Sequence, residues 1–137
     1  MADLRPLIRL NRHQLEQLQK ALGELRVEAE RLEQQKQDLA DRLSREAETA
    51  KADHIAACAF LPFRERTKRD QTQLDQALSR VNARITLQLD RIGDAFAELK
   101  KLELAQDKRE AEHRQKLARQ EADELDEIAL QRHGRSS

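Results

Sequence analysis

The sequence predicts an all-α protein in which two long helices fold back on each other as an antiparallel coiled-coil hairpin. Charged residues and apolar residues each make up 38% of the 137 residues, and the chain has 3 Phe, 3 Gly, 2 Pro and no Trp or Tyr. That composition suits long helices and lacks the aromatic residues and loops of a globular core. Apolar residues also recur in alternating steps of three and four, which is the spacing of a heptad seam.

The first predicted helix covers about residues 3–59 and carries one seam. Asn11 and Lys36 interrupt its apolar pattern, and polar residues in a seam fix the register of a coiled coil at some cost in stability. The residues of this helix that are predicted to form the coiled-coil core are Leu15, Leu18, Leu22, Leu25, Leu32, Leu39 and Leu43.

A turn is predicted at about residues 60–62, in a segment of different character. The stretch 55–63 has no charged residue, and a basic run, residues 64–69, follows it. Pro62 disfavours a continuous helix and pushes Leu61 out of the helical region of backbone conformation. The apolar side chains of this segment, Phe60, Leu61 and Phe63, are interpreted either as a plug for the end of the hairpin or as a docking site.

The second predicted helix covers about residues 63–133, with Gly134 as its stop and a short tail at 134–137. Gln88 is the polar interruption of its seam. After Leu102 the old register meets polar residues such as Gln106, while a weaker apolar stripe begins at Leu104, so the inward face there is left open. A turn at 60–62 pairs Leu18 with Ala105 and leaves about residues 121–133 without a partner. The core residues predicted on this helix are Leu78, Val81, Ile85, Ile92 and Leu99.

The sequence shows no motif for catalysis, so an enzyme and a cofactor are not expected. Gly-rich phosphate loops, paired Cys motifs and Ser-His-Asp patterns are absent from it. His54 and Cys58 lie four residues apart, but two ligands do not make a metal site, and none is predicted. Cys58 is interpreted as a small buried apolar residue.

Charge and hydropathy restrict the location and the partners. The chain has 26 basic and 26 acidic residues, so a nucleic-acid partner is not expected, and the basic run 64–69 more plausibly contacts an acidic protein surface. The longest apolar run is shorter than a membrane-spanning helix, and a cytoplasmic protein is predicted.

A heptad seam indicates that a helix packs on a second helix, but not whether the same chain or another chain supplies that second helix. The single Pro-marked break near mid-chain favours a monomeric hairpin, and a self-dimer is the alternative. A self-associating structural coiled coil or a holdase-like chaperone that grips clients at residues 60–63 also remains open, while a nucleic-acid-binding rod is a more distant reading.

The two seams, the mid-chain turn and the ending Leu125-Asp126-Glu127-Ile128-Ala129-Leu130-Gln131-Arg132 resemble the FliJ family of flagellar export proteins. The stalk proteins of virulence type III secretion share this pattern and are the alternative. The resemblance implies a non-catalytic stalk that inserts into a hexameric export ATPase. It also implies contact with export chaperones and with the cytoplasmic domain of the export-gate membrane protein. Such a protein is expected in the cytoplasm, peripherally associated with the inner membrane through the export apparatus.

The resemblance also assigns expected contacts by position. The ATPase ring is expected to contact Leu4, Ile8, Leu125, Ile128 and Arg132. The export gate is expected to contact Phe60, Leu61, Phe63 and Arg64.

Overall fold

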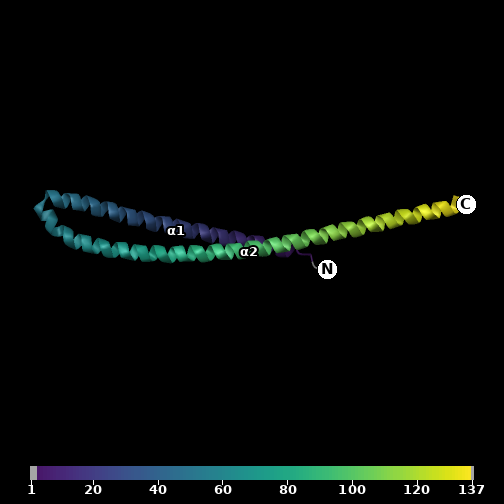
Figure 1. The fold of residues 1–137 in the computed structure, drawn as a ribbon, viewed down its shortest axis with the longest axis horizontal. Coiled ribbons are helices and arrows are strands. Elements are labelled where there is room, and N and C mark those ends of the chain that lie inside the picture. The colour runs from purple at the N-terminus through teal and green to yellow at the C-terminus, as the bar shows by residue number, and fades with distance from the viewer. Residues whose placement is uncertain (1–2, 137) are drawn as a thin grey trace. The chain divides into compact units, whose positions relative to one another are not determined.

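The computed structural model describes residues 3–136, which form two helices, α1 (Arg5–Ala52) and α2 (His54–Ser136) (Figure 1). The predicted all-α helical hairpin is therefore confirmed. The chain divides into two compact units, one formed by residues 15–94 and the other by the residues up to Gln14 together with those from Ala95 onward. Each unit contains part of both helices.

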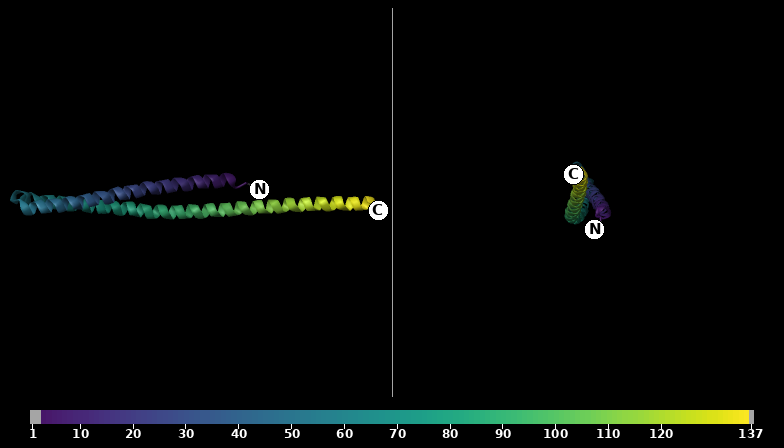
Figure 2. Two further views of the ribbon diagram at one scale, coloured as in Figure 1. Left: turned by 90° about the horizontal axis from the view of Figure 1, so that it is seen from above. Right: turned by 90° about the vertical axis from the view of Figure 1, so that its right-hand side faces the viewer.

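In the unit of residues 15–94, α1 and α2 run antiparallel and side by side from the turn (Figures 1 and 2). At its centre Leu32, Leu78 and Val81 are buried, and Ala29, Leu74, Ala77 and Ile85 pack against them. The seam places these side chains together because residues three and four apart share one face of a helix.

Of the core residues predicted across both units, six are buried, and the other six, Leu18, Leu25, Leu39, Leu43, Ile85 and Ile92, are half-buried.

The turn lies at Asp53, so the predicted turn at 60–62 and the predicted helix bounds of 3–59 and 63–133 are wrong. The Asp53 carboxylate accepts a hydrogen bond from the Ile55 backbone N–H at 3.0 Å, which caps the start of α2. The backbone N–H of Asp53 still donates to the Thr49 carbonyl at 3.2 Å, and the Asp53 carbonyl accepts from Ala57 at 2.9 Å. The chain thus reverses with a single residue, Asp53, between the two helices.

Pro62 lies inside α2, in its third turn. A proline has no N–H to donate to the carbonyl four residues earlier, here that of Cys58, and this weakens a helix without forbidding it. The prediction failed because it gave the breaking effect of Pro62 more weight than the capping side chain of Asp53.

An earlier turn shifts the register between the helices. The Gln88 side chain donates to the Leu18 carbonyl at 2.8 Å, and the Lys36 ammonium lies 2.8 Å from the Asp75 carboxylate. The predicted pairing of Leu18 with Ala105 is therefore wrong. Because α1 ends sooner, it reaches less far along α2 than the sequence suggested.

In the other unit, the start of α1 packs on α2 around Leu99 and Gln106. Ile8 and Leu99 are 6% and 5% exposed, and the Leu4 N–H donates to the Gln106 side chain at 3.1 Å. After Leu102 the inward face continues the earlier seam, since Gln106 is half-buried while Leu104 is 67% exposed.

The C-terminal end of α2 passes Gly134 and reaches Ser136, so the predicted stop at Gly134 and the tail from 134 are wrong, while Ser137 lies outside the described residues. No glycine among the described residues has a positive φ, so Gly134 keeps a helical backbone. A glycine permits a helix end but does not impose one.

Candidate functional site

The candidate binding surface is the C-terminal arm, which we define as residues 112–135 of α2. Each of these residues is exposed, and the sequence supports the helix with acid-before-base pairs such as Glu112 and Lys116. Apolar side chains lie in the open along it, with Leu125 66%, Ile128 47% and Leu130 72% exposed. A helix that exposes large apolar residues in this way is typical of one that binds a partner.

The structure separates the five residues expected at the ATPase ring. Leu125, Ile128 and Arg132 lie on the C-terminal arm and are exposed, while Leu4 is half-buried and Ile8 is buried against α2. Leu4 lies beside Gln106, and Leu125 is roughly 28 Å further along α2 at the helical rise per residue. The two groups therefore do not form one surface, because the turn at Asp53 shortens the reach of α1.

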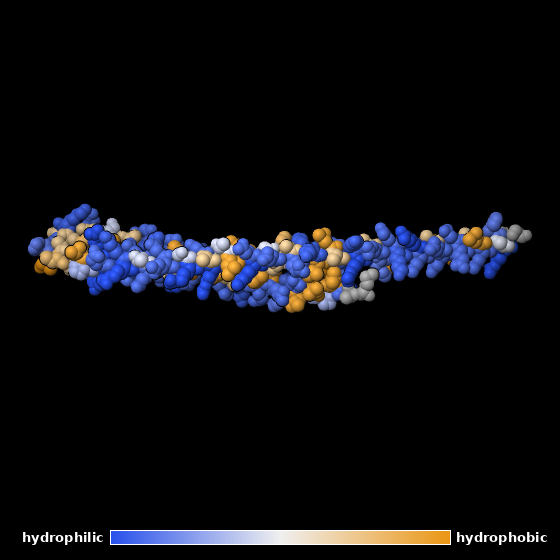
Figure 3. Space-filling view, turned by 60° about the horizontal axis from the view of Figure 1, so that its bottom comes forward, coloured by the Kyte–Doolittle hydropathy of each residue, from blue (hydrophilic) through white to orange (hydrophobic). Residues whose placement is uncertain are grey.

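The hairpin tip, which we define as residues 53–63, holds the side chains expected at the export gate. Leu61 is 59% exposed and Ile55 80%, whereas Phe60 and Phe63 are half-buried. The Arg42 guanidinium of α1 lies over the Phe63 ring at 5.2 Å from its centre, so this phenylalanine supports the helix pair. Arg64 follows the tip and is exposed. Apolar atoms gather at this end of the molecule, on the left in Figure 3.

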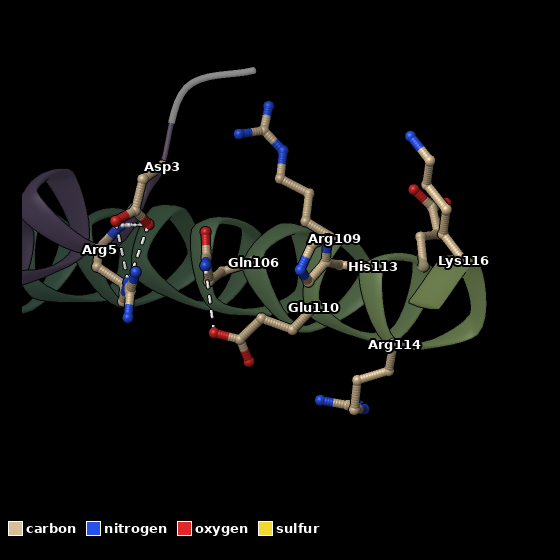
Figure 4. A pocket seen from close by; sticks show the side chains of 9 residues that line it. Asp3, Arg5, Gln106, Arg109, Glu110, His113, Arg114 and Lys116 are labelled. Carbon is tan, nitrogen blue, oxygen red and sulfur yellow. Dashed lines mark hydrogen bonds and ion pairs between the residues drawn. The ribbon is translucent and has the colours of Figure 1, made fainter. Parts of the chain in front are cut away.

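A shallow groove lies where α1 begins, and its side chains spread along α2 (Figure 4). The Arg5 guanidinium donates to the Asp3 carboxylate at 3.0 Å, and this hydrogen bond lowers the pKa of Asp3 and raises the pKa of Arg5. Gln106 accepts from Leu4 and donates to Glu110 at 3.2 Å. The labelled side chains in Figure 4 do not converge on one point. Of these contacts, the hydrogen bond between Leu4 and Gln106 joins the start of α1 to α2.

The pair His54 and Cys58 lies at the hairpin tip, and both residues are exposed. The interpretation of Cys58 as a buried residue is wrong, because it lies on the face of α2 that points away from α1. Within residues 3–136, no three His, Cys, Asp or Glu side chains lie close enough together to hold a metal ion.

Two polar residues of the interface were not expected to matter. Thr67 is 3% exposed, and Gln106 accepts a hydrogen bond from the N–H of Leu4, the residue before α1. The burial of Thr67 could have been predicted from the sequence, because its position continues the seam of Leu78 and Leu74 towards the N-terminus in steps of three and four. The contact of Gln106 depends on the register and could not be found before the turn was placed.

Comparison with known families gives one result. The family model described as flagellar FliJ protein matches residues 1–137. The chain belongs to the FliJ family. The resemblance seen in the sequence is thus confirmed, and the chain is a flagellar export-related protein. Neither the curated proteins nor the solved structures gave a match. In the part of the chain that the structure describes, no helix has the length and hydropathy needed to span a membrane.

Proposed function

We propose that this chain is a non-catalytic stalk and adaptor of the flagellar type III export ATPase, and that its C-terminal arm inserts into the hexameric ATPase ring. The observation that carries the proposal is the exposure of every residue of the arm, residues 112–135. A lone helix about 10–12 Å wide is narrow enough to enter a ring of subunits and presents side chains in all directions. Membership of the FliJ family places the chain among the export-related proteins.

The arm would act by contact alone. ATP would be bound and hydrolysed by the ring, and the arm would favour those ring conformations to which it binds best. Leu125 and Ile128 supply apolar contacts, and Arg132 supplies a cation one helical turn beyond Ile128. The proposed ring contact does not include Ile8, because this residue is buried in the hairpin. Leu4 is half-buried beside Gln106, at a point of α2 that lies before the arm.

The hairpin would carry the adaptor function. We place the contact with the export-gate membrane protein at Leu61 and Arg64, which are exposed, with Phe60 and Phe63 holding that part of α2 against α1. Export chaperones complete the set of proposed partners. The proposed location is the cytoplasm, with peripheral association at the inner membrane through the export apparatus.

The test uses the full chain and the cognate export ATPase. A variant with Leu125→Ser and Ile128→Ser should lose most of its binding to the ATPase and most of any stimulation of ATP hydrolysis. Leu104→Ser is a matched control, because Leu104 is 67% exposed and Leu125 is 66% exposed, but Leu104 lies before the arm. Equal behaviour of the double variant and the control would contradict the proposal.

A structural coiled coil that associates with itself is the second candidate. The exposed apolar residues of the arm favour it, because a second arm could cover them as well as a ring could. The mass of the protein in solution separates this candidate from the stalk.

A further inference from the structure

The hairpin tip exposes apolar side chains and lies in a stretch of the chain without charged residues. Ile55 is 80% and Leu61 59% exposed, and no charged residue occurs between residues 55 and 63. The exposed face between these two residues is completed by small apolar or weakly polar side chains, Ala57, Cys58, Ala59 and Pro62. Single exposed apolar residues are ordinary on a protein surface, whereas a continuous set at one end of a molecule marks a binding surface.

A basic band follows directly on the same helix. Within residues 64–69 there are four cations and one anion, Glu65, and all four cations are exposed: Arg64, Arg66, Lys68 and Arg69. Two of the nearby acids are occupied, because Glu48 pairs with Lys51 at 3.1 Å and Asp53 caps the start of α2. Asp41, Glu46 and Asp70 are further exposed acids on this side, and Arg42 and Arg45 are further cations. Residues 41–70 therefore carry seven cations and six acids, a net charge of +1, and the excess of cations lies in the basic band.

We propose that the hairpin tip docks on an anionic phospholipid bilayer, with Ile55 and Leu61 entering the interface and the basic band contacting lipid phosphates. The order of the two features along α2 matches the order of layers in a bilayer, where the apolar region lies beneath the charged headgroups. Leu61 and Arg66 are roughly 7 Å apart along the helix axis, which is close to the depth at which interfacial helices bury their apolar residues. Long cationic side chains can also extend to reach the phosphates.

The export-gate contact proposed above shares Leu61 and Arg64 with this lipid contact, because the gate is a membrane protein and lipid surrounds it. Charge complementarity assigns the rest of the basic band, Arg66, Lys68 and Arg69, to the lipid surface. Anionic lipids present a dense, continuous negative surface that attracts clustered Lys and Arg without needing a defined geometry. The four cations are spread around the exposed half of α2 and do not converge on one point, which suits such a surface. The inference is independent of ring insertion, because the tip and the arm are different parts of the chain.

The experiment is a flotation assay with the full chain and purified lipid vesicles. We expect the protein to float with vesicles rich in phosphatidylglycerol, to remain unbound with pure phosphatidylcholine, and to be released as salt is raised. No other protein is present, so the result does not depend on whether the proposed ATPase stalk is correct.

Matched variants locate the contact. Ile55→Ser with Leu61→Ser should abolish flotation, while Val27→Ser with Leu87→Ser, at two exposed apolar positions elsewhere on the hairpin, should leave it unchanged. Removing one cation near a lipid surface weakens binding about fivefold. Arg66→Gln with Arg69→Gln should therefore weaken binding about 25-fold by the same estimate, and Arg80→Gln with Arg84→Gln serves as its control. Circular dichroism confirms that each variant keeps its helices.

Three outcomes would overturn the proposal. The first is equal binding to neutral and anionic vesicles. The second is unchanged binding by both the Ile55/Leu61 double variant of the tip and the Arg66/Arg69 double variant of the basic band. The third is binding to soluble polyglutamate without binding to vesicles, which would assign the basic band to an acidic protein surface.

Discussion

Gln88 illustrates how one polar side chain sets the alignment of two helices. It is 6% exposed, and its amide donates to the Leu18 carbonyl at 2.8 Å. A buried amide without a partner costs roughly 1–3 kcal/mol, so sliding α2 along α1 would be penalised. Asn11, which the sequence also suggested for this role, donates to the Leu7 carbonyl of its own helix at 2.9 Å and does not cross the interface.

We predict that Gln88→Ala lowers the free energy of unfolding by about 1–3 kcal/mol, because it removes the cross-helix hydrogen bond and leaves space in the seam. Urea unfolding followed by circular dichroism measures this change. Gln88→Leu is the matched variant, and it should be at least as stable as the original chain because it fills the space with apolar atoms. An unchanged unfolding midpoint for Gln88→Ala would show that the contact does not hold the helices together.

The pair Lys36 and Asp75 makes stability depend on pH at the alkaline end. The hydrogen bond to Asp75, aided by charge attraction, raises the pKa of Lys36 above its ordinary value of 10.5. A group whose pKa is raised by folding stabilises the fold fully below its unfolded pKa, and that contribution is lost as pH rises through the folded pKa. Both side chains are about half exposed, at 44% and 55%, so solvent screening keeps the effect small.

Asp75→Asn should therefore lower Tm at neutral pH, and the difference from the original chain should vanish above the raised pKa of Lys36. Thermal unfolding of both proteins across this range measures the effect, and added salt should shrink the difference at neutral pH. A difference that persists in strongly alkaline solution would assign the loss to packing at Asp75 and not to the ion pair.

At the scale of the helices, the position of the turn decides what the seams can reach. The seams themselves could be read from the sequence, because alternating steps of three and four survive wherever α1 and α2 are in contact. The position of the turn could not be predicted from the sequence. Pro62 strongly indicates a helix break, whereas Asp53 indicates one only weakly, through a single capping carboxylate. That error led to the wrong register and to an unpartnered C-terminal stretch, about residues 121–133, that was predicted too short.

We predict that Pro62→Ala stabilises the protein by up to about 3 kcal/mol, because alanine restores the N–H that α2 lacks opposite the Cys58 carbonyl. The free energy of unfolding from urea titration is the measurement. Asp53→Ala should act in the opposite direction, by about 0.5–2 kcal/mol, since it removes the cap of α2. If the chain reversed at residues 60–62 instead, Pro62→Ala would be neutral or destabilising and Asp53→Ala would have little effect.

For the molecule as a whole, the seam of α1 packs against the seam of α2 of the same chain. In the unit of residues 15–94, the buried residues of α1 face buried residues of α2, which leaves no seam there for a second copy. The apolar residues of the C-terminal arm are different, because residues 112–135 have no covering helix in the part of the chain that the structure describes. Any association between copies should therefore depend on the arm.

We predict that light scattering of the purified full chain gives the mass of a single chain, because the exposed apolar residues of one arm are too few to hold a stable dimer at micromolar concentration. If a dimer is found, Leu125→Ser with Ile128→Ser should return it to a monomer, which would favour a self-associating coiled coil over a stalk. A dimer that survives this double variant would mean that α1 of one chain pairs with α2 of another. That result would contradict the hairpin itself, since both arrangements bury the same seams and differ only in how many chains supply them.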